Sequence, residues 1–138
     1  RERWEQTLEH GIVGLIGDEI VATGVIRIQD AWAQTDVADR AKGTQAELGW
    51  IISPQHQGRG IGTEFAAELL RIAIEELGGL RRVEAACFAA NTASWRIMQR
   101  IGMRQEGLFT EESLHRSGRW MDGMSWAILA SEYRAQHP

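Results

Sequence analysis

Gln57-Gly58-Arg59-Gly60-Ile61-Gly62-Thr63 is the stretch around which the other features of this sequence are arranged. Its three glycines alternate with Arg59 and Ile61, and a helical pattern follows directly. A backbone with so few side chains can turn sharply and approach a ligand closely. The N–H groups that open the following helix have no partners within that helix and favour a negative charge. The stretch therefore predicts a site for phosphate or pyrophosphate, to which Arg59 would add a positive charge.

Two common phosphate motifs do not describe this stretch. The Walker-type loop ends in Gly-Lys-Ser/Thr, whereas Gly62 is followed by Thr63 and Glu64. The dinucleotide fingerprint Gly-x-Gly-x-x-Gly would need its third glycine one position beyond Gly62. On the glycines alone, a tight turn that caps a helix and binds no ligand remains the alternative.

The composition is that of one globular domain. The chain has 138 residues, of which 43% are hydrophobic, and its net charge of −4 comes from interleaved acidic and basic residues. That pattern lacks the clustered Lys and Arg of a nucleic-acid face and is compatible with a cationic substrate. No apolar run approaches the roughly 20 residues of a membrane span, and no signal-peptide pattern opens the chain.

The cysteine and histidine content limits which disulfides and metal sites the chain could contain. A single cysteine, Cys87, excludes an intrachain disulfide and suits a reducing compartment, so we expect a cytoplasmic location. Within a predicted strand, Cys87 is expected to be a small buried hydrophobe. Because the histidines are scattered without ligand spacing, we expect no metal; His56, beside the glycines, is expected to be a solvated loop residue. The histidines are His10, His56, His115 and His137.

Hydrophobic periodicity predicts a mixed sheet covered by helices. The third strand, 46–52, is expected to be buried because of Leu48, Trp50, Ile51 and Ile52. The helix after the glycines has the clearest pattern, with apolar residues recurring every four positions from Ile61 to Leu77. In chain order we expect a helix end at 1–10, a hairpin of strands at 12–16 and 20–29, an exposed loop at 30–45, a strand at 46–52, a helix from 61 to Gly78, a strand at 82–88, a helix from the N-cap Asn91 to 101, strands at 103–110 and 120–129, and a polar tail with Tyr133.

These motifs and their order resemble the GNAT acetyltransferases. The resemblance rests on Gln57-x-x-Gly60-x-Gly62 after a strand, and on Asn91-x-x-Ser94 opening a helix that ends in Ile101-Gly102-Met103. The tail, Arg104 to Phe109 followed by a hairpin with Asp122 and Gly123, resembles the Rim-type branch, which acetylates the N-termini of ribosomal proteins. The resemblance runs from about Glu47 to Glu132, so we expect one GNAT domain over 1–138 whose opening strand is missing.

The resemblance implies an α/β (α+β mixed) fold, with a mostly antiparallel mixed sheet and a V-shaped splay between two parallel strands. It implies that the glycine loop binds the pyrophosphate of acetyl-CoA through backbone N–H groups. The pantetheine arm would pair with the backbone of Trp50 to Ile52. Asn91 would hold the amide arm and Ser94 would lie near the sulfur, although Asn91 as a plain helix cap and Ser94 as an idle hydroxyl remain alternatives. The implied cofactor-binding residues are Trp50, Ile51, Ile52, Gln57, Gly58, Arg59, Gly60, Ile61, Gly62, Thr63, Asn91 and Ser94.

The implied chemistry needs a base, an oxyanion site and a route for the leaving thiolate. Glu47 is the candidate general base, because family members often carry a carboxylate there; a strand-edge glutamate facing solvent is the alternative. A backbone N–H near Ile51 or Ile52 would meet the oxyanion. Where many family members have a tyrosine that protonates the sulfur, this chain has Met98, so Ser94 is the proposed substitute.

We therefore expect an N-acetyltransferase that moves acetyl from acetyl-CoA to a primary amine by direct attack in a ternary complex. The expected acceptor is a peptide or protein N-terminal amine. A small amine such as a polyamine or an aminoglycoside is the alternative acceptor, and a non-catalytic CoA-binding module is the alternative from another class. The expected partners are acetyl-CoA, the amine and, as an option, a second copy of the chain, without nucleic acid or membrane.

Overall fold

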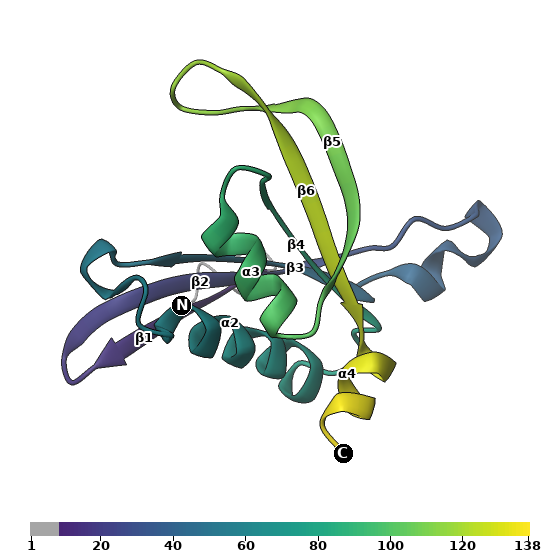
Figure 1. Ribbon diagram of the computed structural model, residues 1–138. Helices are drawn as coiled ribbons and strands as arrows, with labels where there is room; N and C mark the ends of the chain where they lie inside the picture. The colour runs from purple at the N-terminus through teal and green to yellow at the C-terminus, as the bar shows by residue number, and fades with distance from the viewer. Residues whose placement is uncertain (1–8) are drawn as a thin grey trace.

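The computed structural model describes residues 9–138, which form a six-stranded sheet with its α-helices packed on one face (Figure 1). The strand order is β1-β2-β3-β4-β6-β5. The elements are β1 (Glu9–Ile16), β2 (Glu19–Gln29), η1 (Thr35–Ala41), β3 (Gln45–Ile52), η2 (Pro54–His56), α2 (Ile61–Arg71), its π-helical continuation η3 (Ile72–Glu76), β4 (Arg82–Phe88), α3 (Thr92–Arg100), β5 (Arg104–Leu114), β6 (Trp120–Leu129) and α4 (Ala130–Gln136).

One parallel pair divides this otherwise antiparallel sheet. β3 and β4 pair in parallel from Gln45 with Arg82 to Leu48 with Ala85. Beyond Leu48, β3 continues to pair with β2, and beyond Ala85, β4 continues to pair with β6. The two strands therefore separate, and the predicted fold, a mixed sheet with a V between parallel strands, is confirmed.

The hairpin at the start of the described chain agrees with the prediction only in part. β1 and β2 pair across the turn at Gly17, whose φ is 60°. The predicted helix over 1–10 lies mostly outside the described residues, but Glu9 and His10 belong to β1. Gly11 pairs with Val25 inside this strand and does not end a helix, because the strand pattern of β1 extends past it on both sides.

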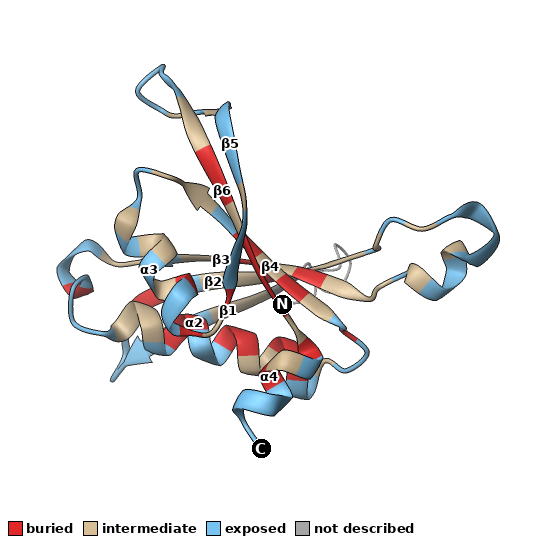
Figure 2. Cartoon of the chain, turned by 45° about the vertical axis from the view of Figure 1, so that its right-hand side comes forward, coloured by how far each residue is buried: buried red, intermediate tan, exposed pale blue. Residues whose placement is uncertain are grey.

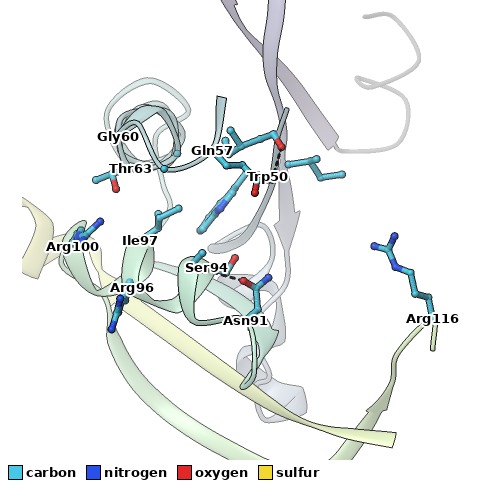
Figure 3. Close-up of a pocket in the computed structure, with 15 residues that line it drawn as sticks. Trp50, Gln57, Gly60, Thr63, Asn91, Ser94, Arg96, Ile97, Arg100 and Arg116 are labelled. Carbon is cyan, nitrogen blue, oxygen red and sulfur yellow. Dashed lines mark hydrogen bonds between the residues drawn. The ribbon is translucent and has the colours of Figure 1, made fainter. Parts of the chain in front are cut away.

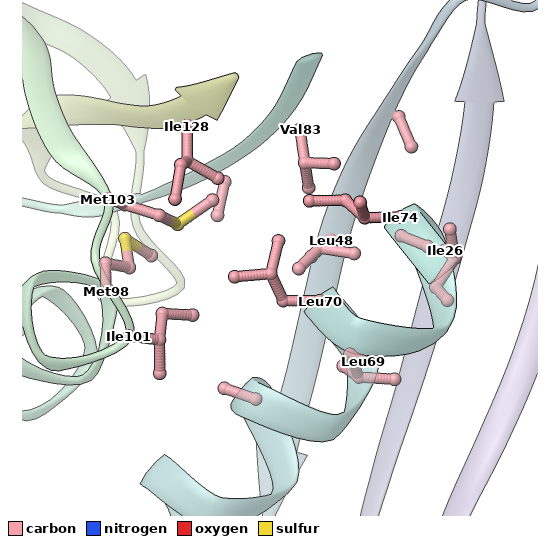
Figure 4. Packing of buried hydrophobic residues seen from close by; sticks show 14 of the residues in the cluster. Ile26, Leu48, Leu69, Leu70, Ile74, Val83, Met98, Ile101, Met103 and Ile128 are labelled. Carbon is pink, nitrogen blue, oxygen red and sulfur yellow. The ribbon is translucent and has the colours of Figure 1, made fainter. Parts of the chain in front are cut away.

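The core lies between the helices and the sheet (Figures 2 and 4). Leu69, Leu70 and Ile74 of the long helix pack there with Val83 and Ile128 of the strands. The helix lies so close to β2 that a Cβ on Gly24 would come within 2.8 Å of both Leu69 and Phe65. None of the described helices is long and apolar enough to span a membrane.

Two exposed isoleucines show where hydrophobicity alone misleads. Ile51 was expected in a buried strand, yet its exposed fraction is 72%. It points away from the helices, because Leu48 and the helix-facing residues of β3 occupy the alternate positions. Ile20, near the tip of the first hairpin, is 56% exposed for lack of a covering element among the described residues.

The polar tail predicted after residue 129 is a helix. The Leu129 N–H donates to the Glu132 carboxylate at 2.8 Å and so supports the start of α4. Tyr133 is only 5% exposed, and its hydroxyl donates to Glu75 Oε2 at 2.6 Å. Burial and the Glu75 carboxylate raise the pKa of Tyr133 to about 12. α4 is therefore docked on the end of the long helix rather than being a loose tail.

The last hairpin, formed by β5 and β6, is longer than predicted and projects beyond the body of the sheet (Figure 1). Its register shifts between Phe109 and Ser113. Glu111 in this bulge has a φ of 46°, and its N–H donates to Asp122 Oδ1 at 2.8 Å. The Asp122 carbonyl in turn accepts from the Ala89 N–H at 2.9 Å, which ties the bulge to the loop that leads into α3.

Candidate coenzyme site

A cavity of about 690 Å³ opens where β3 and β4 separate (Figure 3). β3, the glycine turn and the start of α2 form one wall, and the first two turns of α3 form the other. Arg116 reaches it from the turn between β5 and β6. The lining residues are Trp50, Ile51, Ile52, Gln57, Gly58, Gly60, Gly62, Thr63, Asn91, Ala93, Ser94, Arg96, Ile97, Arg100 and Arg116.

The glycine turn presents backbone N–H groups to this cavity. Gly58 and Gly60 have φ values of 77° and 80°, a conformation in which other residues are strained. Gly60 is the N-cap of α2 and supplies no side-chain hydrogen bond. The first bond within the helix runs from the Glu64 N–H to the Gly60 carbonyl at 3.1 Å. The N–H groups of Ile61, Gly62 and Thr63 precede it, which is the arrangement that binds an anion.

Two contacts hold the turn in place beside the end of β3. Gln57 Nε2 donates to the Ile52 carbonyl at 3.1 Å. A Cβ on Gly62 would lie 2.8 Å from Ile97 Cδ1 and 3.4 Å from Ile52 Cγ1, so a larger residue there would require the Ile97 side chain to shift. Gly62 therefore lets α2 and the Ile97 side chain of α3 lie close together at this end of the cavity.

The α3 wall carries polar side chains rather than bare backbone. Asn91 is the N-cap, as predicted, and its Oδ1 accepts from the Ser94 N–H at 3.2 Å. This bond uses the amide oxygen, so the two N–H donors of Asn91 are not part of the cap. Ser94 lines the same cavity one turn into the helix (Figure 3).

Three arginines that the sequence reasoning did not single out also line the cavity: Arg96, Arg100 and Arg116. Arg96 lies 5.9 Å from the ring centroid of Trp95. Arg96 and Arg100 are four residues apart, which places both on one side of α3. That spacing was the available signal, although a pair of exposed arginines on a helix is common. Nothing in the sequence indicated that Arg116 would come near α3.

Some of the predicted site residues lie outside the cavity. Arg59 is exposed on the turn, and Ile61 packs toward the core. Glu47 lies on the face of the sheet opposite the helices, since its neighbours Ala46 and Leu48 are buried on the helix side. The other predicted cofactor-binding residues all belong to the lining given above.

Two residues given no role in the predicted site have distinct environments. His56 is 7% exposed, so the expectation of a solvated histidine was wrong; it packs beside β2, with Nε2 3.8 Å from Glu19 Oε1. Cys87 is half-buried, and burial raises the pKa of its thiol. A less acidic thiol is a poorer nucleophile at neutral pH. Within residues 9–138, no three His, Cys, Asp or Glu side chains gather as a metal site would require.

Comparisons with known proteins identify the family to which this fold belongs. A model of the "Acetyltransferase (GNAT) domain" matches residues 3–104. Among curated proteins, the uncharacterised N-acetyltransferase YnaD of Bacillus subtilis is 36% identical over 87 residues, which are 63% of this chain and 50% of that protein. The putative ribosomal N-acetyltransferase YdaF of Bacillus subtilis is 30% identical over 92 residues, 67% of this chain and 49% of that protein. The chain thus spans about half the length of the curated relatives it matches.

Solved structures agree with this result. A GNAT-family acetyltransferase from Bacillus anthracis has a TM-score of 0.68 at 29% identity and covers 90% of this chain and 67% of that one. Spermidine N-acetyltransferase from Vibrio cholerae, solved with CoA and spermine, has a TM-score of 0.77 at 21% identity and covers 96% of this chain and 75% of that one, a likeness of fold alone. With two parallel strands that separate beyond Leu48 and Ala85, and with a family model matched over most of its length, the chain belongs to the GNAT acetyltransferase family.

Proposed function

We propose that the protein transfers an acetyl group from acetyl-CoA to a primary amine by direct attack in a ternary complex. One observation carries the proposal: the gap between β3 and β4 and the open N–H groups of α2 face the same cavity. An anion site at one end of a slot bounded by strand backbone suits a ligand with a diphosphate and an extended amide arm.

The residues that line the cavity fit acetyl-CoA. The amides of the glycine turn would take the pyrophosphate, and Arg96 and Arg100 supply positive charge nearby. Among residues 9–138, no strand pairs with the backbone of Trp50 to Ile52 on the β4 side, and this backbone would pair with the pantetheine arm. Asn91 would donate to the arm's carbonyl groups. Arg59 and Ile61 would contribute through their backbone N–H groups.

The proposed chemistry begins with a neutral amine attacking the thioester carbonyl. Glu47, through water, would take the proton that the amine loses. A backbone N–H near Ile51 or Ile52 would stabilise the oxyanion. The C–S bond then breaks and the thiolate leaves; the Ser94 hydroxyl would donate a hydrogen bond to it and relay a proton from solvent water, which gives CoA and leaves Ser94 as a hydroxyl. Because a thiol of pKa about 8.5 is a fair leaving group, Ser94 contributes less than Glu47.

For the acceptor we propose a peptide or protein N-terminal amine. An N-terminal amine, with a pKa of about 8, is partly neutral at pH 7, which eases attack. An N-terminal amine is also favoured by the name of YdaF, a putative ribosomal N-acetyltransferase, and by the resemblance of the tail from Arg104 to Gly123 to the Rim-type branch. Two half-buried carboxylates near the gap, Glu47 and Glu84, favour a small cationic amine as the second candidate.

Two measurements test the function. Calorimetry with CoA measures binding, and release of free thiol from acetyl-CoA measures transfer to short peptides with free N-termini, the same peptides with blocked N-termini, and polyamines. The proposal expects CoA binding and thiol release with free N-termini only. Release with polyamines alone would move the acceptor to small amines. CoA binding without release for any amine would favour a non-catalytic module, and the absence of binding would overturn both.

A further inference from the structure

The side chains that line the cavity carry positive charge, although the net charge of the protein is −4. Arg96, Arg100 and Arg116 line it, and none of the described residues in its lining is Asp or Glu. None of these three arginines forms an ion pair within residues 9–138, whereas Arg71 and Arg104 each pair with two carboxylates. The three guanidinium groups are therefore available to an anionic ligand.

Arg116 is separated from the other two arginines of the cavity (Figure 3). Arg100 lies on the side of Gly60 and Thr63, where the pyrophosphate would bind. Arg116 lies on the opposite side, and Ser94 lies between the two ends. Since the coenzyme would extend from the glycine turn to a sulfur near Ser94, Arg116 lies beyond the thioester. This end of the cavity is therefore the end that an acceptor would occupy.

The turn that carries Arg116 is held by hydrogen bonds and by a ring contact. The His115 N–H donates to the Arg119 carbonyl at 2.9 Å, and the Gly118 N–H donates to the His115 carbonyl at 2.9 Å. The His115 ring packs edge-on against Phe88 at the end of β4, with the ring centroids 5.2 Å apart. The backbone at Arg116 is therefore held beside β4, while its side chain is exposed at the cavity.

A guanidinium at the acceptor end favours an acceptor that carries an anionic group. Its planar set of donors matches a carboxylate, and such charge-assisted pairs are stronger than neutral hydrogen bonds. A polyamine would bring further positive charge beside Arg116, and like charges brought together oppose binding. A peptide with an acidic residue near its N-terminus would bring both the amine for the thioester and a carboxylate for Arg116.

We propose that Arg116 is a specificity-determining residue that binds an acidic side chain at the second or third position of the acceptor peptide. This inference rests on the proposed transfer to a peptide N-terminal amine. The second and third residues directly follow the amine, so they are the ones that would lie beside the turn between β5 and β6 while the amine reaches the thioester. Arg116 takes no part in the bond changes or the proton transfers.

The test compares kcat/KM at saturating acetyl-CoA for paired peptides that differ only in Asp or Asn at the second or the third position. Their C-termini are amidated, so the Asp carboxylate is the only one present. The unmodified protein should prefer Asp to Asn about tenfold at one of these positions, mainly through KM. In Arg116→Gln the preference should fall to about one, and Arg116→Lys should keep about threefold, because the charge remains without the planar donors.

Two further variants separate the charge of Arg116 from the structure of the turn. Arg119→Gln removes the same charge from the same turn at an exposed residue outside the cavity lining, so it should keep the Asp preference. Arg116→Glu should instead prefer a peptide with Lys at that position, a reversal that a distorted turn would not produce. Comparing ratios between proteins cancels the effect of the Asp carboxylate on the basicity of the amine. CoA affinity, measured by calorimetry, should be unchanged in Arg116→Gln.

The outcomes distinguish the two proposals. Equal rates with Asp and Asn peptides in the unmodified protein, or an Asp preference that survives in Arg116→Gln, would overturn the role of Arg116 and leave the proposed function intact. Weaker CoA binding by Arg116→Gln with an unchanged preference would assign Arg116 to the coenzyme and overturn its role in acceptor choice. Thiol release with polyamines but with no peptide would overturn that role and the peptide acceptor together. An unmodified protein that releases no thiol with any amine would overturn the proposed function itself.

Discussion

The two walls of the cavity present different kinds of binding group. The β3–α2 wall offers backbone N–H groups, exposed by glycines at positions where φ is positive or space is short. The α3 wall offers side chains, from Asn91 and Ser94 to Arg96 and Arg100. A backbone wall depends on conformation and tolerates few substitutions, whereas a side-chain wall distributes binding over groups that can each be removed. Coenzyme affinity should therefore respond sharply to changes in the first wall and gradually to changes in the second.

The largest effect is expected for Gly60→Val. A β-branched residue does not keep the φ of 80°, so the first N–H groups of α2 would turn away from the anion. Losing two charge-assisted hydrogen bonds should weaken CoA binding about 100-fold, measured by calorimetry. Gly60→Asn should be far milder, because asparagine tolerates the left-handed conformation.

A control for backbone strain alone is available at the other end of the same helix. Gly79 has a φ of 75° and open space where a Cβ would lie, but it is remote from the cavity. Gly79→Val should lower the melting temperature by a similar amount and leave CoA affinity unchanged. Equal CoA affinities for Gly60→Val and Gly60→Asn would show that the turn does not hold the anion.

The next effect is expected where the two walls touch. In Gly62→Ala the new methyl group would lie 2.8 Å from Ile97 Cδ1, so the Ile97 side chain would have to shift within the cavity that it lines. Overpacking of this kind typically costs between about 1 and 3 kcal/mol, so CoA affinity should fall about tenfold. Ile97→Val removes that Cδ1, and the double variant should recover most of the affinity. Failure of the second substitution to help would mean that Gly62 matters for another reason.

The same contrast explains how much of the site could be predicted. Gly58 and Gly60 could be predicted as a turn because backbone with positive φ favours glycine. The helix after them could be predicted because its apolar residues recur at a regular helical spacing. Asn91 was recognisable as a cap for the same kind of local reason. The strands and their order along the chain followed from local patterns and the family resemblance, except that β1 begins within the stretch predicted to be the end of a helix.

What could not be predicted depends on contacts between distant segments. Arg116 reaches the cavity only because β5 and β6 fold back past α3. Tyr133 is buried where α4 docks on the long helix, and its hydroxyl donates a hydrogen bond to Glu75, which is far away in sequence. The ion pair of Glu47 with Arg27 arises from the register in which β2 pairs with β3. The identity of a residue does not indicate which distant residue it will contact in the folded chain.

A moderate effect is expected on the side-chain wall. Arg100→Gln should weaken CoA binding about fivefold at low salt and less at high salt, because an exposed charge is screened. Calorimetry at two salt concentrations measures both. Arg134→Gln on α4 removes the same charge away from the cavity and should change neither value. A salt-independent loss for Arg100→Gln would indicate that Arg100 packs against the coenzyme rather than attracting its phosphates.

The smallest effect separates the two roles of Asn91. Asn91→Ala removes the bond to the Ser94 N–H and should cost about 1 kcal/mol of unfolding free energy, whereas Asn91→Ser keeps a cap and should cost little. Both variants lose the amide N–H donors, so both should weaken CoA binding by about threefold if Asn91 donates to the coenzyme. Denaturant unfolding and calorimetry on the same two variants give the answer. If only Asn91→Ala binds CoA more weakly, the side chain serves the helix alone, and the second wall contributes its arginines and Ser94 without it.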